Sequence, residues 1–494
     1  MSSSLKRLFA HSGVYAMGTA LSTAVLFFLL PLFTRILSPE AFGMYETLAP
    51  VLGILSMVST LGFTSALLKT HERDAHTPTE RKELIGTTLL VVLPLTTILT
   101  AGLYFFRSQL AEWLLDDASL SHLIAIVLGT NWLLVLYQVG LAVLRTKERS
   151  RFYATLTVIR ALFLLGFNLV ALLVFHLGLE AVLGVQLLVN AILDILLLRT
   201  LLRESSFRFS IPLFKRLTAF GLAVFPAQIA MWFMDLSDRF FLKGALSFDE
   251  VGYYSLAYRI GTVVNILLIV PFQLAWPTYS YSIADSKVAQ KKYAHSLSLF
   301  VSGGLFLALA LSLYASGLIR LLGTEAYQSA VVIVPFVATG YVLYGAHFIL
   351  TTGIHLKNKS RWYPLFIVIP ALLNIALNAV FVPRYGILAA ATTTLVSFVL
   401  VSVLTYIVTQ RMYPVSYLWR QLVTSIAVFC VVLMLGWWVV HLEAIPRTAS
   451  VETFAWEFLT PLPFLLIYGL ALLKTLNIPL RTLPERVKTL LSRM

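Results

Sequence analysis

Charged residues are scarce in this chain. Only 12% of its 494 residues are Asp, Glu, Lys or Arg, whereas 59% are apolar, and the mean hydropathy is +0.86. A soluble domain needs about twice that share of charged residues to cover its surface. The composition therefore excludes a soluble protein and predicts an all-α polytopic membrane protein.

Cysteine is almost absent, and long loops are missing. Cys430 is the single cysteine, which excludes an internal disulfide and a multi-cysteine metal site. No loop is long enough to fold as a domain, and the acidic pair Asp116-Asp117 has only His122 near it in sequence. An enzyme acting on lipid-linked sugars needs an acid or base on a sizeable outward loop. We therefore predict that the chain is not an enzyme and needs neither cofactor nor metal.

Long hydrophobic runs occupy most of the sequence. A hydropathy window of about 19 residues indicates about fourteen transmembrane helices. The spans lie near residues 12–33, 46–68, 84–106, 122–144, 152–175, 180–200, 217–238, 252–276, 296–318, 330–353, 362–382, 386–408, 419–441 and 458–476.

The net charge of +14 is distributed by topology. With the N-terminus inside, the inner loops hold about four times as many Lys and Arg residues as the outer loops, as the positive-inside rule requires. Both termini are then cytoplasmic, and the first span, preceded by Lys6 and Arg7 and lacking a cleavage site, is a retained helix. The basic charge indicates contact with anionic membrane lipids and no nucleic-acid partner.

A short motif occurs twice. Leu37-Ser-Pro-Glu-Ala-Phe-Gly-Met-Tyr45 follows the first span, and Leu246-Ser-Phe-Asp-Glu-Val-Gly-Tyr-Tyr254 follows the seventh. Six spans between the copies give both halves the same orientation. This predicts two six-helix bundles related by a pseudo-two-fold axis along the membrane normal, with a central cavity between them.

The repeat also predicts the organisation of the chain. We expect an N-terminal bundle at 1–200, a cytoplasmic amphipathic linker at 201–216, a C-terminal bundle at 217–410, and appended helices 13 and 14 with a cytoplasmic tail at 411–494. Proline interrupts equivalent spans of the two halves, which favours gating helices, although static packing kinks explain any single proline equally well. The gating candidates are Pro31, Pro50, Pro226 and Pro271.

Three stretches resemble one transporter family. They are Pro31 through Tyr45, Asp238-Arg239 leading into Gly252-Tyr-Tyr254, and Leu377-Asn378 through Pro383-Arg-Tyr-Gly386-Ile-Leu-Ala-Ala, where a Gly-Ala pair is more usual at the end. Together they are similar to the polysaccharide-transporter (Wzx-type flippase) branch of the multidrug/oligosaccharidyl-lipid/polysaccharide (MOP) exporter superfamily.

The resemblance implies export of an undecaprenyl-diphosphate-linked oligosaccharide across a bacterial cytoplasmic membrane by alternating access, without an ATP-binding element. No glycine-rich phosphate loop is present. A lipid II flippase of the MurJ type and a small-molecule or cation antiporter of the same superfamily remain alternatives, although buried arginines favour an anionic substrate. The apolar last two spans suit either the lipid tail or a docked polysaccharide polymerase.

Arginines within spans are the main candidates for substrate binding, because each buried charge needs a reason. Arg259 sits roughly 10 Å below the outer end of span 8 with no acid three or four residues away, and Arg160 sits about 12 Å inside span 5. With Arg239, they would draw in the diphosphate, since a guanidinium donates to two phosphate oxygens at once. The alternative for Arg160 is that its side chain extends to the inner headgroups.

Aromatic and acidic side chains complete the predicted site. Glu46 would face the cavity from the other half, and Trp232, Tyr254 and Tyr258 would stack on sugar faces. Gln186, Asn190 and Asp194 share one helix face, as do Gln228, Trp232, Asp235 and Arg239. Asp194 and Asp235 are the candidates for coupling to a proton or sodium ion, although Asp235 and Arg239 can also neutralise each other within their helix.

Overall fold

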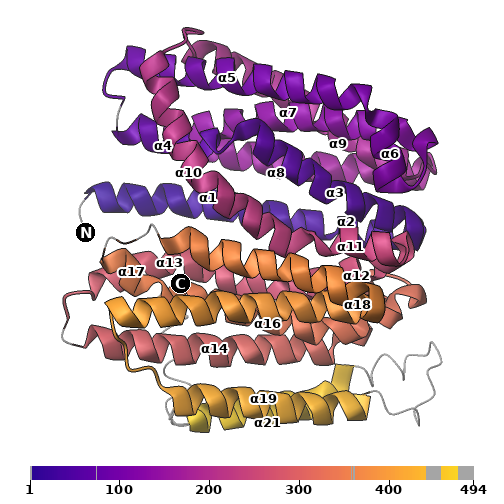
Figure 1. The fold of residues 1–494 in the computed structure, drawn as a ribbon, viewed down its shortest axis with the longest axis vertical. Helices are drawn as coiled ribbons and strands as arrows, with labels where there is room; N and C mark the ends of the chain where they lie inside the picture. Colours follow the sequence, from indigo (N-terminus) through magenta and orange to yellow (C-terminus); the bar gives the residue numbers. More distant parts are fainter. Residues whose placement is uncertain are drawn as a thin grey trace. The chain divides into compact units, whose positions relative to one another are not determined.

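The computed structural model describes residues 3–73, 75–286, 288–357, 359, 362–440 and 458–476. Every regular element in this part of the chain is helical (Figure 1). Twelve of the described helical segments are long and apolar enough to cross a membrane, and one further apolar helix is shorter. These segments confirm the all-α polytopic fold, while the count of fourteen spans stays a prediction.

The chain divides into two compact units. One comprises Met1–Lys243 with Ser247–Gly252, and the other comprises Gly244–Leu246 with Tyr253–Met494. The helices up to the division are α1 (Ser3–Phe27), α2 (Leu29–Ile36), α3 (Pro39–Thr60), α4 (Phe63–Arg73), α5 (Pro78–Phe105), α6 (Arg107–Leu115), α7 (Ser121–Thr146), α8 (Ser150–Leu169), α9 (Leu179–Glu204), α10 (Ile211–Leu236) and α11 (Asp238–Ala245).

The helices after the division include several short and irregular turns. They are α12 (Phe248–Gly261), the π-turn η3 (Asn265–Ile269), α13 (Val270–Ser282), α14 (Ala289–Leu313), α15 (Ala315–Leu322), the 3₁₀ segment η4 (Glu325–Ile333), α16 (Val334–Leu350), α17 (Thr352–Leu356), α18 (Tyr363–Met412), α19 (Trp419–Val440) and α21 (Pro461–Thr475).

Local sequence sets where the helices begin. Ser38 caps α3 by accepting from the amide of Ala41 at 3.1 Å, and Pro39 occupies the first turn, where no amide donor is needed. Thr77 and Glu80 form a reciprocal capping box at the start of α5. These caps satisfy helix-end donors that would otherwise be costly near a membrane.

In the first unit, α1 packs against α8, α7 lies between α5 and α9, and α4 contacts both α7 and α10. One apolar core joins α4, α5 and α7 with Leu201 of α9 and Leu213 and Leu217 of α10. Helix α10 therefore packs within the first unit, whereas the sequence boundary assigned residues 217–238 to the second bundle. The repeat-based division into bundles stays a prediction.

The amphipathic linker expected at 201–216 stays a prediction, and much of this segment is helical. Residues up to Glu204 continue α9, and α10 begins at Ile211, so only 205–210 is non-helical. Two backbone amides of this short stretch bond to α5. The amide of Ser206 donates to the carbonyl of Lys82 at 3.2 Å, and the amide of Ser210 donates to the Thr87 hydroxyl at 3.0 Å. Burial of Leu213 draws the expected linker into the helix.

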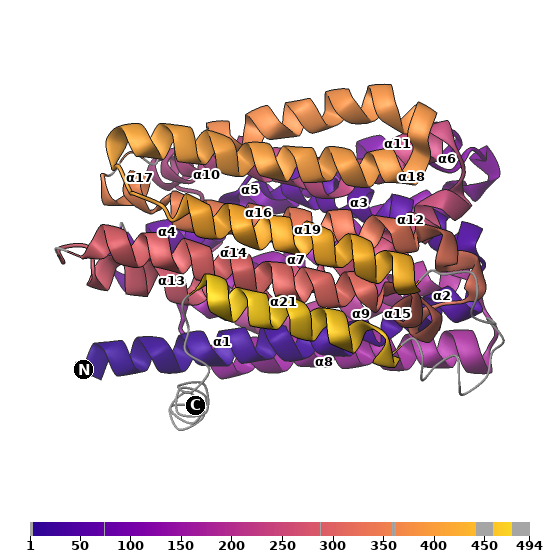
Figure 2. The ribbon, with the colours of Figure 1, turned by 90° about the horizontal axis from the view of Figure 1, so that it is seen from below.

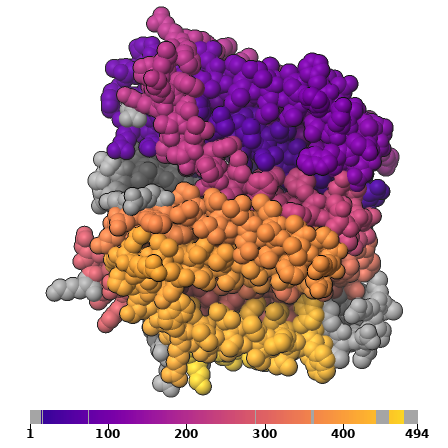
Figure 3. Space-filling view, in the orientation of Figure 1, coloured from indigo at the N-terminus to yellow at the C-terminus, as the bar shows by residue number. Residues whose placement is uncertain are grey.

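In the second unit, α16 packs against α14 and α18, and α19 and α21 pack against α14 (Figure 2). The outer side of α19 exposes apolar residues such as Val431, Met434 and Trp438 and forms part of the yellow-orange surface in Figure 3. An apolar surface of this kind is suited to lipid. The predicted cytoplasmic tail lies outside the described residues.

Helix α18 is two spans joined at a kink. Gly386 has φ 60° and ψ −140°, a conformation essentially restricted to glycine, and the predicted spans 362–382 and 386–408 lie on either side of it. The hydroxyl of Thr393 donates to the side chain of Asn378, which itself donates to Asn374 at 3.1 Å. The two halves therefore lie side by side as a hairpin (Figure 2) and satisfy each other's polar groups.

The predicted proline interruptions coincide with irregular backbone at two positions. Pro31 has no amide to donate to the carbonyl of Phe27, and α1 gives way to α2 at Phe28. Pro271 follows the π-turn Asn265–Ile269 in the same way. Pro50 and Pro226 lie inside α3 and α10. Whether these positions move during a transport cycle stays a prediction.

Replacing Gly386 tests the hairpin. Gly386→Ala should lower the free energy of unfolding by about 1–3 kcal/mol, because alanine is strained at this backbone conformation. The measurement is thermal unfolding in detergent. Gly303→Ala is the matched control: an added Cβ in α14 meets no atom within 4 Å, so its stability should be unchanged or higher. Equal melting temperatures for the two variants would contradict the assignment.

Candidate functional site

The two copies of the repeated motif contact each other. Each begins a helix with a serine cap: Ser247 accepts from the amide of Glu250 at 3.3 Å, as Ser38 does at the start of α3. A Cβ at Gly43 would lie 1.8 Å from the carbonyl oxygen of Phe248, and one at Gly252 would lie 2.6 Å from that of Pro39. Only glycine permits this approach, so the motif copies form a reciprocal backbone contact within the first unit.

A buried ion pair lies one turn further along α3. Nε of Arg239 is 3.9 Å from Oε2 of Glu46, and each side chain is only 3% exposed. A second guanidinium nitrogen of Arg239 donates to the carbonyl of Asp235 at 3.0 Å. The structure thus brings together two residues that the sequence assigned to substrate binding. Removing either partner of such a pair leaves the other charge buried without its counterion.

A second polar cluster is built around Arg160 of α8. Its Nε donates to Oδ1 of Asn190 at 3.2 Å, and its guanidinium lies 5.5 Å from the ring centroid of Tyr137. On the same face of α9, the amide of Gln186 donates to the hydroxyl of Tyr45 at 3.1 Å. The cluster therefore joins α3, α7, α8 and α9, and the predicted polar face of α9 lies within it.

Asp194 ends that polar face. The residue is 5% exposed, and neither carboxylate oxygen has a hydrogen-bond partner among the described residues. A buried carboxylate without partners is costly when charged, so it favours a bound proton or cation. No group of three or more metal-ligating side chains occurs in the described part of the chain. Asp194 is therefore a lone buried carboxylate and not part of a metal-binding cluster in the described residues.

The predicted aromatic residues lie in helix contacts. Trp232 is 5% exposed on α10, and its ring lies 4.9 Å from that of Phe233. Tyr254 and Tyr258 of α12 are buried, and the hydroxyl of Tyr258 lies 3.2 Å from that of Tyr341. For these rings to stack on a sugar, their helices would have to separate. Arg259, beside them on α12, has an exposed side chain.

Sequence reasoning missed Tyr137 and the contact role of Gly43 and Gly252. Tyr137 and Gln138 interrupt a largely apolar stretch of α7, and no polar residue repeats at helical spacing beside Tyr137 to mark it. The glycines stood in both copies of the repeat. Their coincidence in register was the one available sign that the copies meet.

Comparisons with known proteins identify the family. A family model described as "Polysaccharide biosynthesis protein" matches residues 8–282, which is more than half of the chain. The chain belongs to the polysaccharide biosynthesis protein family. This confirms, at the level of the family, the resemblance stated from the three motifs.

One curated member that the chain resembles is the succinoglycan biosynthesis transport protein ExoT of Rhizobium meliloti (strain 1021), at 27% identity over 305 residues. The alignment covers 58% of this chain and 56% of ExoT, so the chain matches little more than half of its relative's length.

Solved structures show the same fold. The lipid II flippase MurJ, in an inward closed conformation, matches with a TM-score of 0.71 at 14% identity, covering 94% of this chain and 99% of that one. An inward-facing multidrug resistance MATE family transporter of the MOP superfamily matches with a TM-score of 0.65 at 15% identity, covering 78% and 93%. The chain therefore shares the all-helical fold of these transporter structures.

The buried ion pair yields a stability prediction. Glu46→Leu or Arg239→Met alone should lower the free energy of unfolding by about 3–5 kcal/mol, whereas the double variant should recover most of the loss, because no lone charge is left buried. Thermal unfolding of all four proteins in detergent completes the double-mutant cycle. Additive losses in the double variant would show that the two side chains are not energetically coupled.

Proposed function

We propose that this protein is a flippase that moves an undecaprenyl-diphosphate-linked oligosaccharide from the inner to the outer leaflet of a bacterial cytoplasmic membrane. The observation that carries the proposal is the family match over residues 8–282. The likeness to ExoT, whose name describes transport in succinoglycan biosynthesis, supports it. The twelve apolar helical segments supply the membrane-spanning scaffold that such transport requires.

Arginines provide the chemistry for the diphosphate. Arg259 presents an exposed guanidinium on α12, and Arg160 lies among hydrogen-bonding groups of α3, α7 and α9. A guanidinium stays charged at any working pH and matches two phosphate oxygens. In this proposal, Arg239 exchanges Glu46 for a phosphate when the helices open, so the ion pair holds the arginine in the empty protein.

Alternating access is the proposed cycle. The reciprocal glycine contact between the starts of α3 and α12 is a contact of backbone on backbone. It can separate and re-form without leaving a side chain unpaired. The interruptions at Pro31 and Pro271 supply the bending positions in this proposal, and both termini would stay on the cytoplasmic side.

Transport of lipid II is the second candidate. It is favoured by the likeness to MurJ over 99% of that chain. A cation antiporter is less suited to this chain, because its site would need acids for a cationic ligand, whereas the proposed binding residues Arg160 and Arg259 are themselves cations.

Complementation tests the proposed function. The intact chain should restore surface glycan in a flippase-deleted bacterium with a matching glycan, and Arg259→Ala should reduce it at equal expression, with partial recovery in Arg259→Lys. Arg320→Ala is the control, because Arg320 pairs with Glu325 at 3.1 Å outside the proposed route. Equal restoration by Arg259→Ala and the control would remove Arg259 from the site. Restoration of a lipid II flippase deletion alone would establish the second candidate.

Asp194 and Asp235 are the proposed coupling residues. The buried carboxylate of Asp194, which has no hydrogen-bond partner among the described residues, supports uptake of a proton or sodium ion during the proposed cycle. We expect Asp194→Asn to fold normally and to flatten the dependence of transport on pH or sodium in proteoliposomes. Asp117→Asn, in an exposed loop, is the matched control and should keep the dependence. If Asp194→Asn and Asp235→Asn both transport with an unchanged response, these acids do not couple transport.

A further inference from the structure

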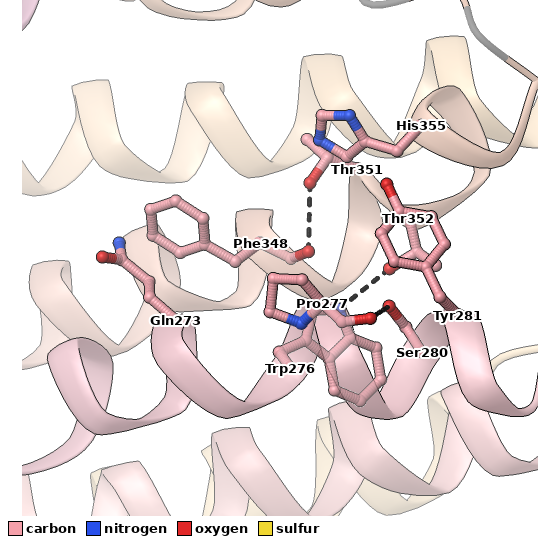
Figure 4. Close-up of a pocket in the computed structure, with 9 residues that line it drawn as sticks. All are labelled: Gln273, Trp276, Pro277, Ser280, Tyr281, Phe348, Thr351, Thr352 and His355. Atoms are coloured by element: carbon pink, nitrogen blue, oxygen red, sulfur yellow. Dashed lines mark hydrogen bonds between the residues drawn. The ribbon is translucent and has the colours of Figure 1, made fainter. Parts of the chain in front are cut away.

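The second unit contains a cavity that none of the predicted site residues line. It lies between α13 on one side and α16 with α17 on the other, and its volume is about 360 Å³ (Figure 4). That volume falls in the range of small-molecule sites. The lining residues are Gln273, Trp276, Pro277, Ser280, Tyr281, Phe348, Thr351, Thr352 and His355.

Each wall of the cavity carries a local irregularity in its backbone hydrogen bonding. Pro277 lies inside α13 and has no amide, so the carbonyl of Gln273 loses its helical donor and can accept from a ligand instead. Opposite, Thr351 separates α16 from α17, and its amide closes the last turn by donating to the carbonyl of His347 at 2.9 Å. Two interruptions that face each other leave space where continuous helices would pack.

A fixed aromatic ring forms one side. Trp276 is 6% exposed, and its Nε1 donates to the hydroxyl of Thr352 across the cavity at 2.9 Å. Its indole stacks on Phe272 with ring centroids 5.1 Å apart and meets the edge of Tyr293 at 5.9 Å. These contacts hold the indole before a ligand arrives, and Phe348 adds a second aromatic ring to the lining.

The polar lining includes one ionisable imidazole, that of His355, and otherwise offers neutral donors and acceptors. Within the described chain, no hydrogen bond is recorded for the amide of Gln273 or the hydroxyl of Tyr281, and Tyr281 is 53% exposed. Neither Asp, Glu, Lys nor Arg lines the cavity. A diphosphate would find neither a lysine nor an arginine in this lining. A pyranose ring, with an apolar face and hydroxyls around its edge, matches both the aromatic wall and the amide and hydroxyl groups.

We propose that this cavity binds a neutral sugar ring of the glycan, at a distance from the diphosphate. The inference rests on the proposed function for the identity of the glycan. Arg259 and Trp276 lie on the same run of α12, η3 and α13, which at 1.5 Å per residue separates them by roughly 25 Å along the helix. A lipid diphosphate at Arg259 and a sugar against Trp276 therefore belong to different parts of one extended substrate.

Protection from thiol labelling tests the cavity directly. In the full chain carrying Cys430→Ser, Gln273→Cys places a thiol in the lining, and Ser282→Cys places one on exposed α13 outside it. The probes are methyl glycosides of glucose, galactose, mannose and N-acetylglucosamine, with glycerol and undecaprenyl diphosphate as comparisons. At roughly ten times its dissociation constant, a bound glycoside should slow maleimide labelling of Gln273→Cys about tenfold and leave Ser282→Cys unchanged.

A second pair of variants separates the sugar from the diphosphate. Trp276→Ala should abolish protection by the glycoside, and Trp276→Phe should keep part of it through the ring. Slowing by glycerol or by undecaprenyl diphosphate, but by no glycoside, would overturn the proposal. A second result would also overturn it: no glycoside protects Gln273→Cys from labelling, and the Trp276→Ala variant transports glycan at the same rate as the unsubstituted chain. Failure of the flippase proposal would show instead as absent complementation, whatever the glycosides do in the labelling experiment.

Discussion

Every polar group inside a membrane must find its partner within the protein, and the local structure of this chain follows from that requirement. Threonine and serine hydroxyls repeatedly donate to carbonyls four residues earlier, as Thr34, Thr47 and Thr96 do. The same requirement explains why α18 doubles back with Asn378 bonded to Thr393.

Charges obey the requirement less uniformly, and the exceptions mark function. Arg239 has Glu46 within 3.9 Å, and Arg160 has Asn190 and the ring of Tyr137. Asp194 alone among the predicted acids is buried with both oxygens unmatched in the described structure. In the proposed cycle, these arginines exchange their partners for a phosphate, whereas the unpaired acid acquires a cation. An anionic substrate and a coupling cation are the two ligands that would meet these opposite needs.

The sequence predicted the helical fold, because hydrophobic runs and loop charges depend on the membrane more than on any partner helix. It also predicted the polar face of α9, since helical periodicity places Asn190 and Asp194 together. It did not predict that Tyr137 joins them, or that α10 packs with the first unit, because contacts between helices leave no periodic trace. The cavity beside Trp276 was missed for a similar reason: it arises where two interruptions meet, and each interruption alone looks like an ordinary kink.

The hairpin at Gly386 bears on how the chain is made. Only a few residues separate its two apolar halves, and the side chain of Asn378 donates to Asn374 and accepts from Thr393 of the returning half. If the first half entered the bilayer alone, the side chain of Asn378 would face lipid without the partner that the second half supplies. The two halves should therefore leave the translocon together during synthesis. The sharp glycine turn makes that joint insertion geometrically possible, which gives the residue a part in biogenesis as well as in the finished fold.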